Sequence, residues 1–552
     1  MALGLLAVPL SGATSGNPLP AKPVEGRSGM VASAHPLATQ AGLEILRQGG
    51  NAVDAAVATA FALGVVEPNA SGLGGGGYIV FYHAKTGKAE AIDYREKAPR
   101  KATADMYPLS PDGKGVLNKA STVGHRACAV PGNLAGLSLA LQRWGTKRLP
   151  EVLAPAIRLA EEGYPVTKTL ADMMNTYYDR LAQFPEASRV YLKDGLAYEP
   201  GEKLVLKDLA KTLRLIAARG PEVFYRGEIA EAIVREMAAG GGLITREDLA
   251  DYQPVVREPV RGTYRGHELI SMPSSSSGGT HVIQLLNILE GYDLAALGHN
   301  TAAALHVQAE AAKRVFADRA KYSGDADFVK VPTAGLLSKE YAAELRKGIN
   351  PEKATEKVAA GNPYSVMSGN TTHASFVDRE GNLVALTQTI NLFFASGVVV
   401  PGYGILLNDE MDDFMPVPGN ANSIAPGKRP ASSMSPTIVL KDGRPFLSLG
   451  SPGSARIITA LPQILMNVID HRMDLQQAIN APRAHCMGGA IEVESRIPET
   501  VRAELQSRGH KLSVRGAVDL HFGGAQAVMI EPGSGRLLGA ADPRRDGVAA
   551  GY

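Results

Sequence analysis

The chain has 552 residues, of which 45% are hydrophobic and 20% are charged, and its formal net charge at pH 7 is +2. This composition is typical of a globular protein with a large core, and the near-neutral charge argues against nucleic-acid binding through bulk electrostatics. No stretch reaches the roughly 20 apolar residues that span a bilayer, so we expect no membrane span.

The N-terminal sequence MALGLLAVPLSGATSG is apolar at first and then small and polar. It resembles the apolar core and cleavage end of a secretory signal, but it lacks the basic segment that normally precedes them. We therefore treat residues 1–25 as a signal-like segment, with a disordered tail as the alternative.

Two helices are expected between residues 35 and 68. Leu37, Ala41 and Ile45 recur at helical spacing, and the Gly-Gly-Asn sequence at 49–51 can end the first helix. Small residues dominate the second helix, which predicts close packing against a sheet. Strand-like runs at 78–83 and 89–94 then flank the turn sequence AKTGK.

The middle of the chain, from about 130 to 350, consists mostly of amphipathic helical segments, and the sequence KATEKVAAGNPYSVMSGN after it is expected to form a flexible loop. Three further hairpins are expected at 373–390, 436–449 and 525–543, with a helix at 456–470. Antiparallel strand pairs with helices stacked outside them indicate a layered α+β architecture.

The sequence SGNTTHASF at 368–376 places Thr371 where the expected loop meets the expected strand. The commonest role for such a threonine is a hydrogen bond to the backbone, and ligand binding is a second possibility. A third role is nucleophilic catalysis, which needs a base to accept the hydroxyl proton. Cleavage just before Thr371 would supply that base, because a free α-amine has a pKa of about 7.7–8.0.

Such a cut needs no protease in principle. The Thr371 hydroxyl can attack the carbonyl of Asn370, shift the acyl group from nitrogen to oxygen, and leave an ester that water hydrolyses. The Gly-Asn pair before Thr371 gives the backbone freedom to adopt a strained conformation at that carbonyl. The chemistry permits this reaction without selecting it.

Several sequence motifs are more specific. The motifs are ASAHPLATQAGLEILRQGGNAVDAAVA, AIDYREKAP, NTTHASFVDREGNLVALTQTIN, GYGILLNDEMDDF, GKRPASSMSPTIV, GSPGSARI, NAPRAH and ADPRRDGVAAGY. Together, and in this order from about residue 25 onward, they resemble γ-glutamyltranspeptidases. The resemblance implies an N-terminal nucleophile hydrolase with a four-layer αββα sandwich. It also implies self-cleavage into a large subunit, 26–370, and a small subunit, 371–552.

The resemblance also assigns roles to individual residues. It makes Thr371 the nucleophile and gives Thr389 a hydrogen bond to the Thr371 hydroxyl. The second assignment has an independent rationale, because the expected hairpin brings the two strands together with Cβ atoms of facing residues about 5 Å apart. The backbone N–H groups of Gly453 and Ser454 would form the oxyanion hole. His373, two residues after the nucleophile, would have a structural role.

A glutamyl substrate carries an α-carboxylate and an α-ammonium, so its site should offer both signs of charge. A guanidinium fork suits a carboxylate, and acidic or amide groups suit an ammonium. By resemblance, the carboxylate would bind Arg95, Ser432 and Ser433, and the ammonium would lie among Asn391, Glu410 and Asp413. Taken alone, Arg95 is as compatible with a surface ion pair, and the acidic sequence NDEMDDF with a solvated turn.

The sequence departs from the family pattern at two places. Ser454 stands where the family usually has a second glycine, which puts acceptor preference in doubt because the side chain can narrow the pocket. The segment 414–431 is short and, after Phe414, has no aromatic residue to close over a substrate. This is similar to the lidless bacterial subgroup and predicts an open cleft.

The implied activity is that of a γ-glutamyltranspeptidase or glutathione hydrolase. A γ-glutamyl group passes from glutathione or another amide to Thr371, and then to water, an amino acid or a dipeptide, in the periplasm or outside a bacterial cell. No cofactor or metal is expected. Cys128 and Cys486 match no metal-ligand spacing and are expected to be buried free thiols rather than a disulfide.

Three alternatives remain open at this point. A glutaryl-7-aminocephalosporanic acid (cephalosporin) acylase shares the fold and nucleophile, but its substrate lacks the α-amino group, so Glu410 and Asp413 favour the transpeptidase. An enzyme that processes poly-γ-glutamate would suit an open cleft. An uncleaved paralogue that only binds γ-glutamyl compounds would need neither Thr371 nor Thr389.

Overall fold

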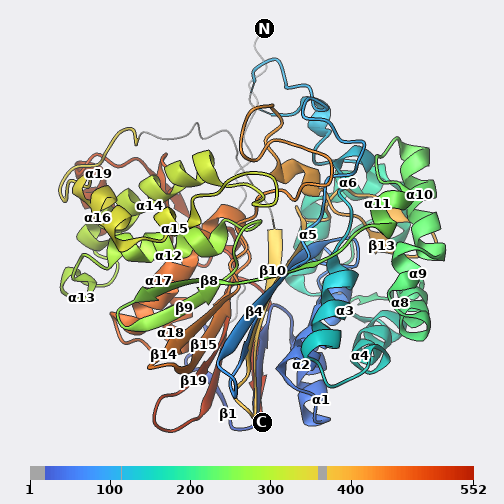
Figure 1. Ribbon diagram of the computed structural model, residues 1–552, viewed down its shortest axis with the longest axis horizontal. Coiled ribbons are helices and arrows are strands. Elements are labelled where there is room, and N and C mark those ends of the chain that lie inside the picture. Colours follow the sequence, from blue (N-terminus) through green and yellow to red (C-terminus); the bar gives the residue numbers. More distant parts are fainter. Residues whose placement is uncertain (1–18, 114, 359–369) are drawn as a thin grey trace.

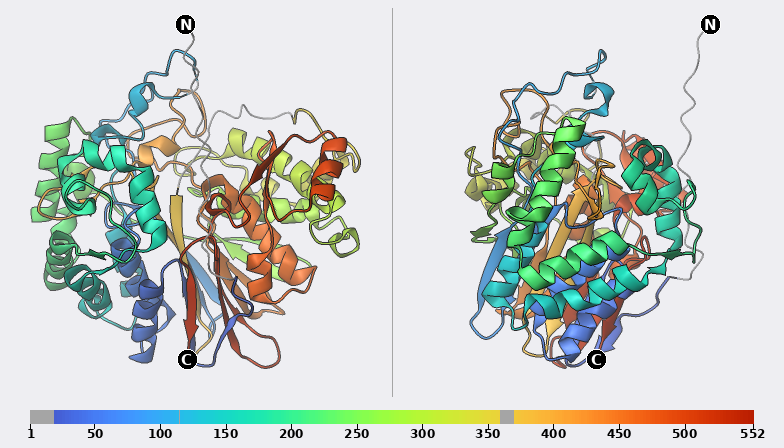
Figure 2. Two further views of the ribbon diagram at one scale, coloured as in Figure 1. Left: turned by 180° about the vertical axis from the view of Figure 1, so that it is seen from behind. Right: turned by 90° about the vertical axis from the view of Figure 1, so that its right-hand side faces the viewer.

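The computed structural model describes residues 19–113, 115–358 and 370–552. Most of the signal-like segment and of the expected loop at 353–370 lie outside these residues. Two seven-stranded sheets lie face to face, and helices cover the outer face of each (Figures 1 and 2). The predicted α+β fold with an αββα sandwich is therefore confirmed.

The first sheet is antiparallel throughout, in the order β21-β2-β10-β11-β3-β4-β7. Its centre is the predicted hairpin of β10 and β11, and the predicted hairpin of β3 and β4 extends it. The strands are β2 (Gly29–Ser33), β3 (Gly76–His83), β4 (Lys88–Asp93), β7 (Val255–Arg257), β10 (Asn370–Asp378), β11 (Leu383–Asn391) and β21 (Val548–Gly551).

The second sheet, also antiparallel, has the order β1-β20-β19-β15-β14-β9-β8. It contains the other two predicted hairpins, β14 with β15 and β19 with β20. The strands are β1 (Val24–Gly26), β8 (Val260–Tyr264), β9 (His267–Ser271), β14 (Thr437–Lys441), β15 (Arg444–Gly450), β19 (Gln526–Ile530) and β20 (Leu537–Ala541).

Helices from the first half of the chain cover the first sheet, on the right of Figure 1. The two predicted helices α1 and α2 pack tightly, and a Cβ atom on Gly42 would lie 2.3 Å from the Thr59 hydroxyl. The helices are α1 (Pro36–Arg47), α2 (Ala52–Val66), α3 (Asn133–Trp144), α4 (Leu149–Glu162), α5 (Lys168–Thr176), α6 (Tyr178–Gln183), α7 (Pro185–Tyr191), α8 (Lys207–Arg219), α9 (Glu222–Tyr225), α10 (Glu228–Gly240) and α11 (Arg246–Ala250).

The second sheet is covered on its outer face by helices that lie before and after position 370, on the left of Figure 1. The predicted helix at 456–470 is α17, which packs beside α12. These helices and their neighbours are α12 (Gly278–Leu289), α13 (Leu294–Leu297), α14 (Ala302–Tyr322), α15 (Thr333–Leu336), α16 (Lys339–Lys347), α17 (Ile457–Ile469), α18 (Leu475–Asn480) and α19 (Glu499–Ser507).

The segments before and after position 370 are interleaved in both sheets. In the first sheet, β10 lies between β2 and β11, and β11 also pairs with β3. In the second sheet, β14 pairs with β9, and β20 pairs with β1. Neither segment therefore contains a complete sheet, and a cut at 370–371 leaves many hydrogen bonds between the two parts.

The region from 130 to 350 is less purely helical than predicted. It includes the β8–β9 hairpin and the edge strand β7, because these short strands complete sheets whose centres come from elsewhere in the chain. Short strands outside the two main sheets are β5 (Tyr164–Pro165), β6 (Lys203–Leu204), β12 (Val399–Val400), β13 (Ile405–Leu406), β16 (Ala484–His485), β17 (Ile491–Glu494) and β18 (Leu512–Arg515). Among the described helices, none has the length and apolar character needed to cross a membrane.

Candidate active site

The two predicted threonines lie together at one end of the β10–β11 hairpin. Asn370 pairs with Asn391 and Thr372 pairs with Gln388, so that two residues of β11, including Thr389, oppose Thr371. This is a β-bulge, which bends a strand and re-aims a side chain. Thr371 is 4% exposed and lines the same pocket as Thr389. The hydrogen bond between their hydroxyls stays a prediction.

The predicted site residues other than Gly453 converge on this one pocket, whose empty volume is about 260 Å³. They come from β10, β11, the residues after β4 and three loops of the second half of the chain. The lining residues are Arg95, Thr371, Thr389, Asn391, Glu410, Asp413, Ser432, Ser433, Met434, Ser454 and Ile457.

Arg95 is buried and ion-paired. Its Nη2 atom lies 2.6 Å from Glu410 Oε1 and also contacts Asp413 Oδ2, while Nη1 lies 3.7 Å from Glu96 Oε2. Burial raises the pKa of Glu410 well above its usual range, although Arg95 opposes the shift, and burial likewise raises the pKa of Glu96 to about 7. The cluster has more carboxyl groups than cations, and it favours a protonated carboxyl over a second buried anion.

Ser432 and Ser433 line the same pocket and lie in the segment before β14. Both residues are buried. Ser432 Oγ accepts a hydrogen bond from the Met434 N–H at 3.1 Å, and Ser433 Oγ accepts one from Arg319 Nη2 at 2.9 Å. Each oxygen thus has a donor from the protein.

Gly453 and Ser454 form a sharp turn between β15 and α17. Their φ angles are +129° and +56°, so two successive residues lie outside the usual right-handed region. Ser454 is strained there, since residues with a Cβ atom rarely adopt positive φ. The turn brings Ser454 to the pocket beside Thr371. The assignment of its N–H and that of Gly453 to an oxyanion hole stays a prediction.

Arg545, which is ion-paired with Glu67, holds the main chain of Thr371. Arg545 Nη1 donates a 2.9 Å hydrogen bond to the Thr371 carbonyl oxygen and lies 3.3 Å from Glu67 Oε1. Burial raises the pKa of Glu67 to about 7, although Arg545 opposes this shift. The arrangement holds the candidate nucleophile through its main chain and leaves its side chain facing the pocket.

A threonine at the start of a central strand and a pocket with both signs of charge agree with the expectation from the motifs. The sequence profile of the gamma-glutamyltranspeptidase family matches residues 38–552. The chain belongs to this family. The predicted resemblance and the predicted enzymatic activity are confirmed.

Known members of the γ-glutamyltranspeptidase family are similar over nearly the whole chain. The chain is 45% identical over 547 residues to the glutathione hydrolase proenzyme of Escherichia coli K12, covering 96% of this chain and 93% of that protein. It is 46% identical over 530 residues to the acylase ACY 1 proenzyme of Pseudomonas sp. SE83, covering 95% and 94%. The structure of the cephalosporin acylase from Bacillus halodurans aligns with a TM-score of 0.88, at 34% identity and 99% coverage of both chains.

His373 does not take part in the threonine pocket of this family member. It is buried, its Nδ1 lies 2.7 Å from Thr387 Oγ1, and its Nε2 lies 3.0 Å from Ser375 Oγ. Burial lowers its pKa to about 3, so the ring is neutral at pH 7. These contacts support the structural role expected for it. Cys128 and Cys486 are buried free thiols, as predicted.

The segment 414–431 forms a compact loop tied to the pocket rim. Asn422 Nδ2 donates to the Asp413 carbonyl oxygen at 2.6 Å, and Asn422 Oδ1 accepts from the Ala431 N–H at 2.9 Å. The buried Lys428 side chain donates to the carbonyl oxygens of Ala421 and Ser423. The loop therefore holds Asp413 in place. The lidless character of the cleft stays a prediction.

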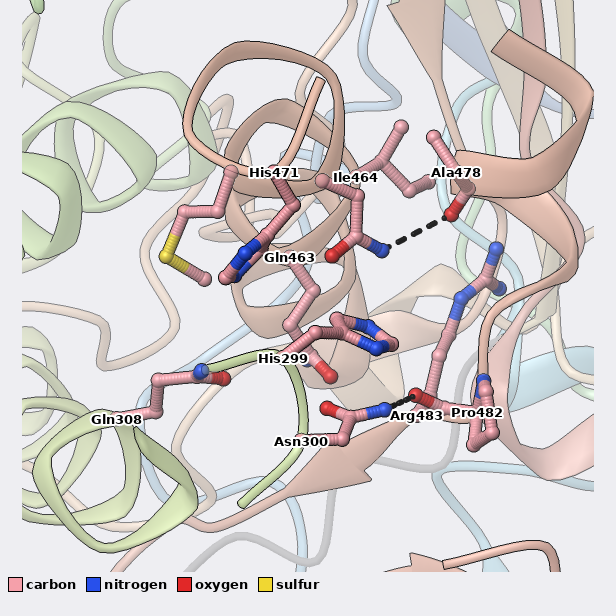
Figure 3. Close-up of a pocket in the computed structure, with 11 residues that line it drawn as sticks. His299, Asn300, Gln308, Gln463, Ile464, His471, Ala478, Pro482 and Arg483 are labelled. Carbon is pink, nitrogen blue, oxygen red and sulfur yellow. Dashed lines mark hydrogen bonds between the residues drawn. The ribbon is translucent and has the colours of Figure 1, made fainter. Parts of the chain in front are cut away.

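A second hollow, shown in Figure 3, lies between α14, α17 and α18 and shares no lining residue with the threonine pocket. The imidazole rings of His299 and His471 lie there with centroids 5.3 Å apart, and Asn300 Nδ2 donates to the Pro482 carbonyl oxygen. Burial lowers the pKa of both histidines. The residues described around this hollow provide no hydroxyl, thiol or carboxylate group, so we assign no nucleophilic chemistry to it.

Sequence reasoning missed four charged residues around the pocket, Glu67, Glu96, Arg319 and Arg545. Glu96 directly follows Arg95, and Arg545 belongs to the C-terminal motif, so proximity to recognised residues was an available signal for both. Glu67 and Arg319 lie in helical or post-helical segments that resemble ordinary surface positions. Only the fold brings these two residues to the site.

Proposed function

We propose that the chain is a proenzyme that cuts itself between Asn370 and Thr371 and then acts as a γ-glutamyltranspeptidase and glutathione hydrolase. The resulting subunits would be 26–370 and 371–552. The position of Thr371 at the bulge, with its carbonyl oxygen held by Arg545 and its side chain in the pocket, supports this proposal. The similarity to proteins named as proenzymes also supports it.

In the proposed cycle, the free α-amine of Thr371 accepts the proton of its own hydroxyl, and the oxygen attacks the γ-carbonyl of the substrate. The oxyanion would receive hydrogen bonds from the N–H groups of Gly453 and Ser454, and Thr389 would orient the nucleophile. The amine product leaves with the proton. Water or the amine of an amino acid or dipeptide then attacks the γ-glutamyl ester and restores Thr371.

The observation that carries the substrate assignment is the ion pairing of Arg95 with Glu410 and Asp413. A γ-glutamyl group brings one carboxylate and one ammonium. The substrate carboxylate can replace the acidic partners of Arg95 and accept further hydrogen bonds from Ser432 and Ser433. The substrate ammonium can then pair with the carboxyl groups that Arg95 has released, beside Asn391. A zwitterionic substrate thus supplies a new partner both to Arg95 and to its acidic partners, so that neither charge stays buried without a counter-ion.

A cephalosporin acylase remains the second candidate, because a relative named as an acylase and a cephalosporin acylase structure are both similar to this chain. A glutaryl group brings only the carboxylate. It would separate Arg95 from Asp413 and leave the Asp413 carboxylate without a cation. Loss of one partner from a buried pair costs about 3–5 kcal/mol, which favours the γ-glutamyl substrate.

Three p-nitroanilides that differ only in these charges test the proposal. The γ-glutamyl compound carries both groups, the glutaryl compound lacks the ammonium, and the 4-aminobutanoyl compound lacks the carboxylate. We expect kcat/KM for the γ-glutamyl compound to exceed each of the others by at least about 100-fold, the equivalent of roughly 3 kcal/mol.

Equal or faster turnover of the glutaryl compound would instead identify an acylase. An uncut protein that binds γ-glutamyl compounds but turns over none of the three would identify a non-catalytic paralogue. Release of glutamate from poly-γ-glutamate at a higher kcat/KM than from glutathione would identify a polymer-processing enzyme.

We also propose a periplasmic or secreted location, on the basis of the signal-like sequence at 1–25. Fractionation of bacterial cells that express the full chain tests this proposal. We expect the activity in the periplasmic fraction or the medium, with an N-terminus beyond the apolar sequence. Activity confined to the cytosol, on an untrimmed chain, would contradict it.

A further inference from the structure

Arg319 approaches the threonine pocket from outside without lining it. It lies in the last turn of α14, and its partly buried side chain reaches two serines in different segments. Its Nε donates to Ser277 Oγ at 2.9 Å, and its Nη2 donates to Ser433 Oγ at 2.9 Å. Only Ser433 belongs to the pocket lining.

These contacts determine the direction of the Ser433 hydroxyl. A guanidinium group has five N–H donors and no acceptor, so the Ser433 oxygen must accept from Arg319. Its own hydrogen is then directed elsewhere, and no acceptor for it is found in the part of the chain that the structure describes. The Ser433 O–H group therefore remains a donor for a ligand in the pocket.

The same arrangement fixes Ser432. Ser277 Oγ accepts from Arg319 and passes its own hydrogen to the Ser432 carbonyl oxygen, at 2.6 Å. The Ser277 N–H donates to the same carbonyl oxygen at 2.9 Å. Ser432 Oγ already accepts from the Met434 N–H, so its hydroxyl hydrogen is also available to the pocket.

Two adjacent O–H donors with satisfied oxygens suit an acceptor with two oxygens, such as a carboxylate. We propose that Arg319 is a positioning residue that orients the Ser432 and Ser433 hydroxyls as donors to the α-carboxylate of the substrate. This inference rests on the proposed γ-glutamyl activity. It assigns recognition of the carboxylate to two guanidinium groups. Arg95 would contact the carboxylate directly, whereas Arg319 would act by orienting serine hydroxyl groups.

The test measures kinetics of Arg319→Gln, Arg319→Lys and Ser277→Ala on the γ-glutamyl, glutaryl and 4-aminobutanoyl p-nitroanilides. For Arg319→Gln we expect roughly a 10- to 100-fold loss of kcat/KM on the two substrates that carry a carboxylate, mainly through KM, since hydrogen bonds to charged groups are individually strong. Turnover of the 4-aminobutanoyl compound should change less than about twofold. Arg319→Lys should recover part of the loss, and Ser277→Ala should show a smaller loss with the same substrate dependence.

A double-mutant cycle with Ser433→Ala tests whether Arg319 acts through this hydroxyl. We expect Arg319→Gln to add less than about threefold to the effect of Ser433→Ala on the γ-glutamyl substrate, because interacting residues are not additive. The exposed Lys321, two residues further along the chain, provides the matched control, and Lys321→Gln should change kcat/KM less than about twofold.

Equal losses on all three substrates, or full additivity with Ser433→Ala, would overturn the inference and indicate a general structural role. If Arg319→Gln remains uncut or unfolded, Ser277→Ala and Arg319→Lys decide the question by the same substrate dependence. Failure of the proposed function is recognised separately, because the wild-type protein would then show no preference for the γ-glutamyl compound.

Discussion

Replacement of Thr371 by alanine is expected to leave one uncut chain of 58.1 kDa, whereas the wild-type protein yields two fragments of about 39 and 19 kDa, the smaller beginning at Thr371. The variant lacks the hydroxyl for cleavage and the nucleophile for turnover. We expect its γ-glutamyl p-nitroanilide activity to fall by about 10⁴-fold or more. Denaturing electrophoresis with mass spectrometry and a kinetic assay measure both effects.

Thr371→Ser provides the control, because it keeps a hydroxyl at the same position. It should still be cut at 370–371, at a reduced rate, and should retain measurable turnover. Cleavage of the alanine variant at the same bond would indicate an external protease. An uncut but fully active wild-type protein would show that catalysis does not require a free α-amine at Thr371.

Replacement of Asp413 by asparagine is expected to lower kcat/KM for the γ-glutamyl substrate by about 10²- to 10³-fold. The change keeps the shape of the side chain but removes a carboxylate that is paired with Arg95 and that we assign to the substrate ammonium. The glutaryl substrate should lose much less or improve, because it has no ammonium. Steady-state kinetics on both substrates measure this change in specificity.

Asp412 provides a matched control in the same four-residue turn. Its Oδ1 accepts a 2.7 Å hydrogen bond from Ser121 Oγ, and it does not line the pocket. Asp412→Asn should change kcat/KM by less than about threefold on either substrate. Similar losses in the two variants, or an equal loss of glutaryl and γ-glutamyl turnover in Asp413→Asn, would show that the acidic turn supports the fold and does not recognise the ammonium.

Much of the fold is predictable because its central elements carry strong local signals. The β10–β11 and β14–β15 hairpins combine apolar strands with clear turn residues, such as Asp442 and Gly443 at φ angles of +51° and +72°. The β8–β9 hairpin was missed because its strands are short and its exposed face is polar. Its position is determined by pairing with β14, which is distant in sequence.

The site could be predicted only in part for a related reason. The predicted site residues lie in motifs that resemble the family, and the structure brings all of them except Gly453 to one pocket. The bulge that sets two residues of β11 against Thr371 could not be read from an alternating strand pattern. The contacts of Arg319 and Arg545 depend on how α14 and the C-terminal segment pack, which no local pattern encodes.

The interleaving of the two segments in both sheets determines how the mature enzyme would resist irreversible unfolding. The precursor folds as one chain, in which the connection keeps the strands at high effective concentration. After the proposed cut at 370–371, an unfolded molecule would become two fragments, neither with a complete sheet and each with unpaired strand edges, so that refolding would be bimolecular and would compete with aggregation. The cut enzyme is therefore expected to persist because its barrier to unfolding is high. Its working lifetime would be determined by the rate of unfolding rather than by an equilibrium free energy.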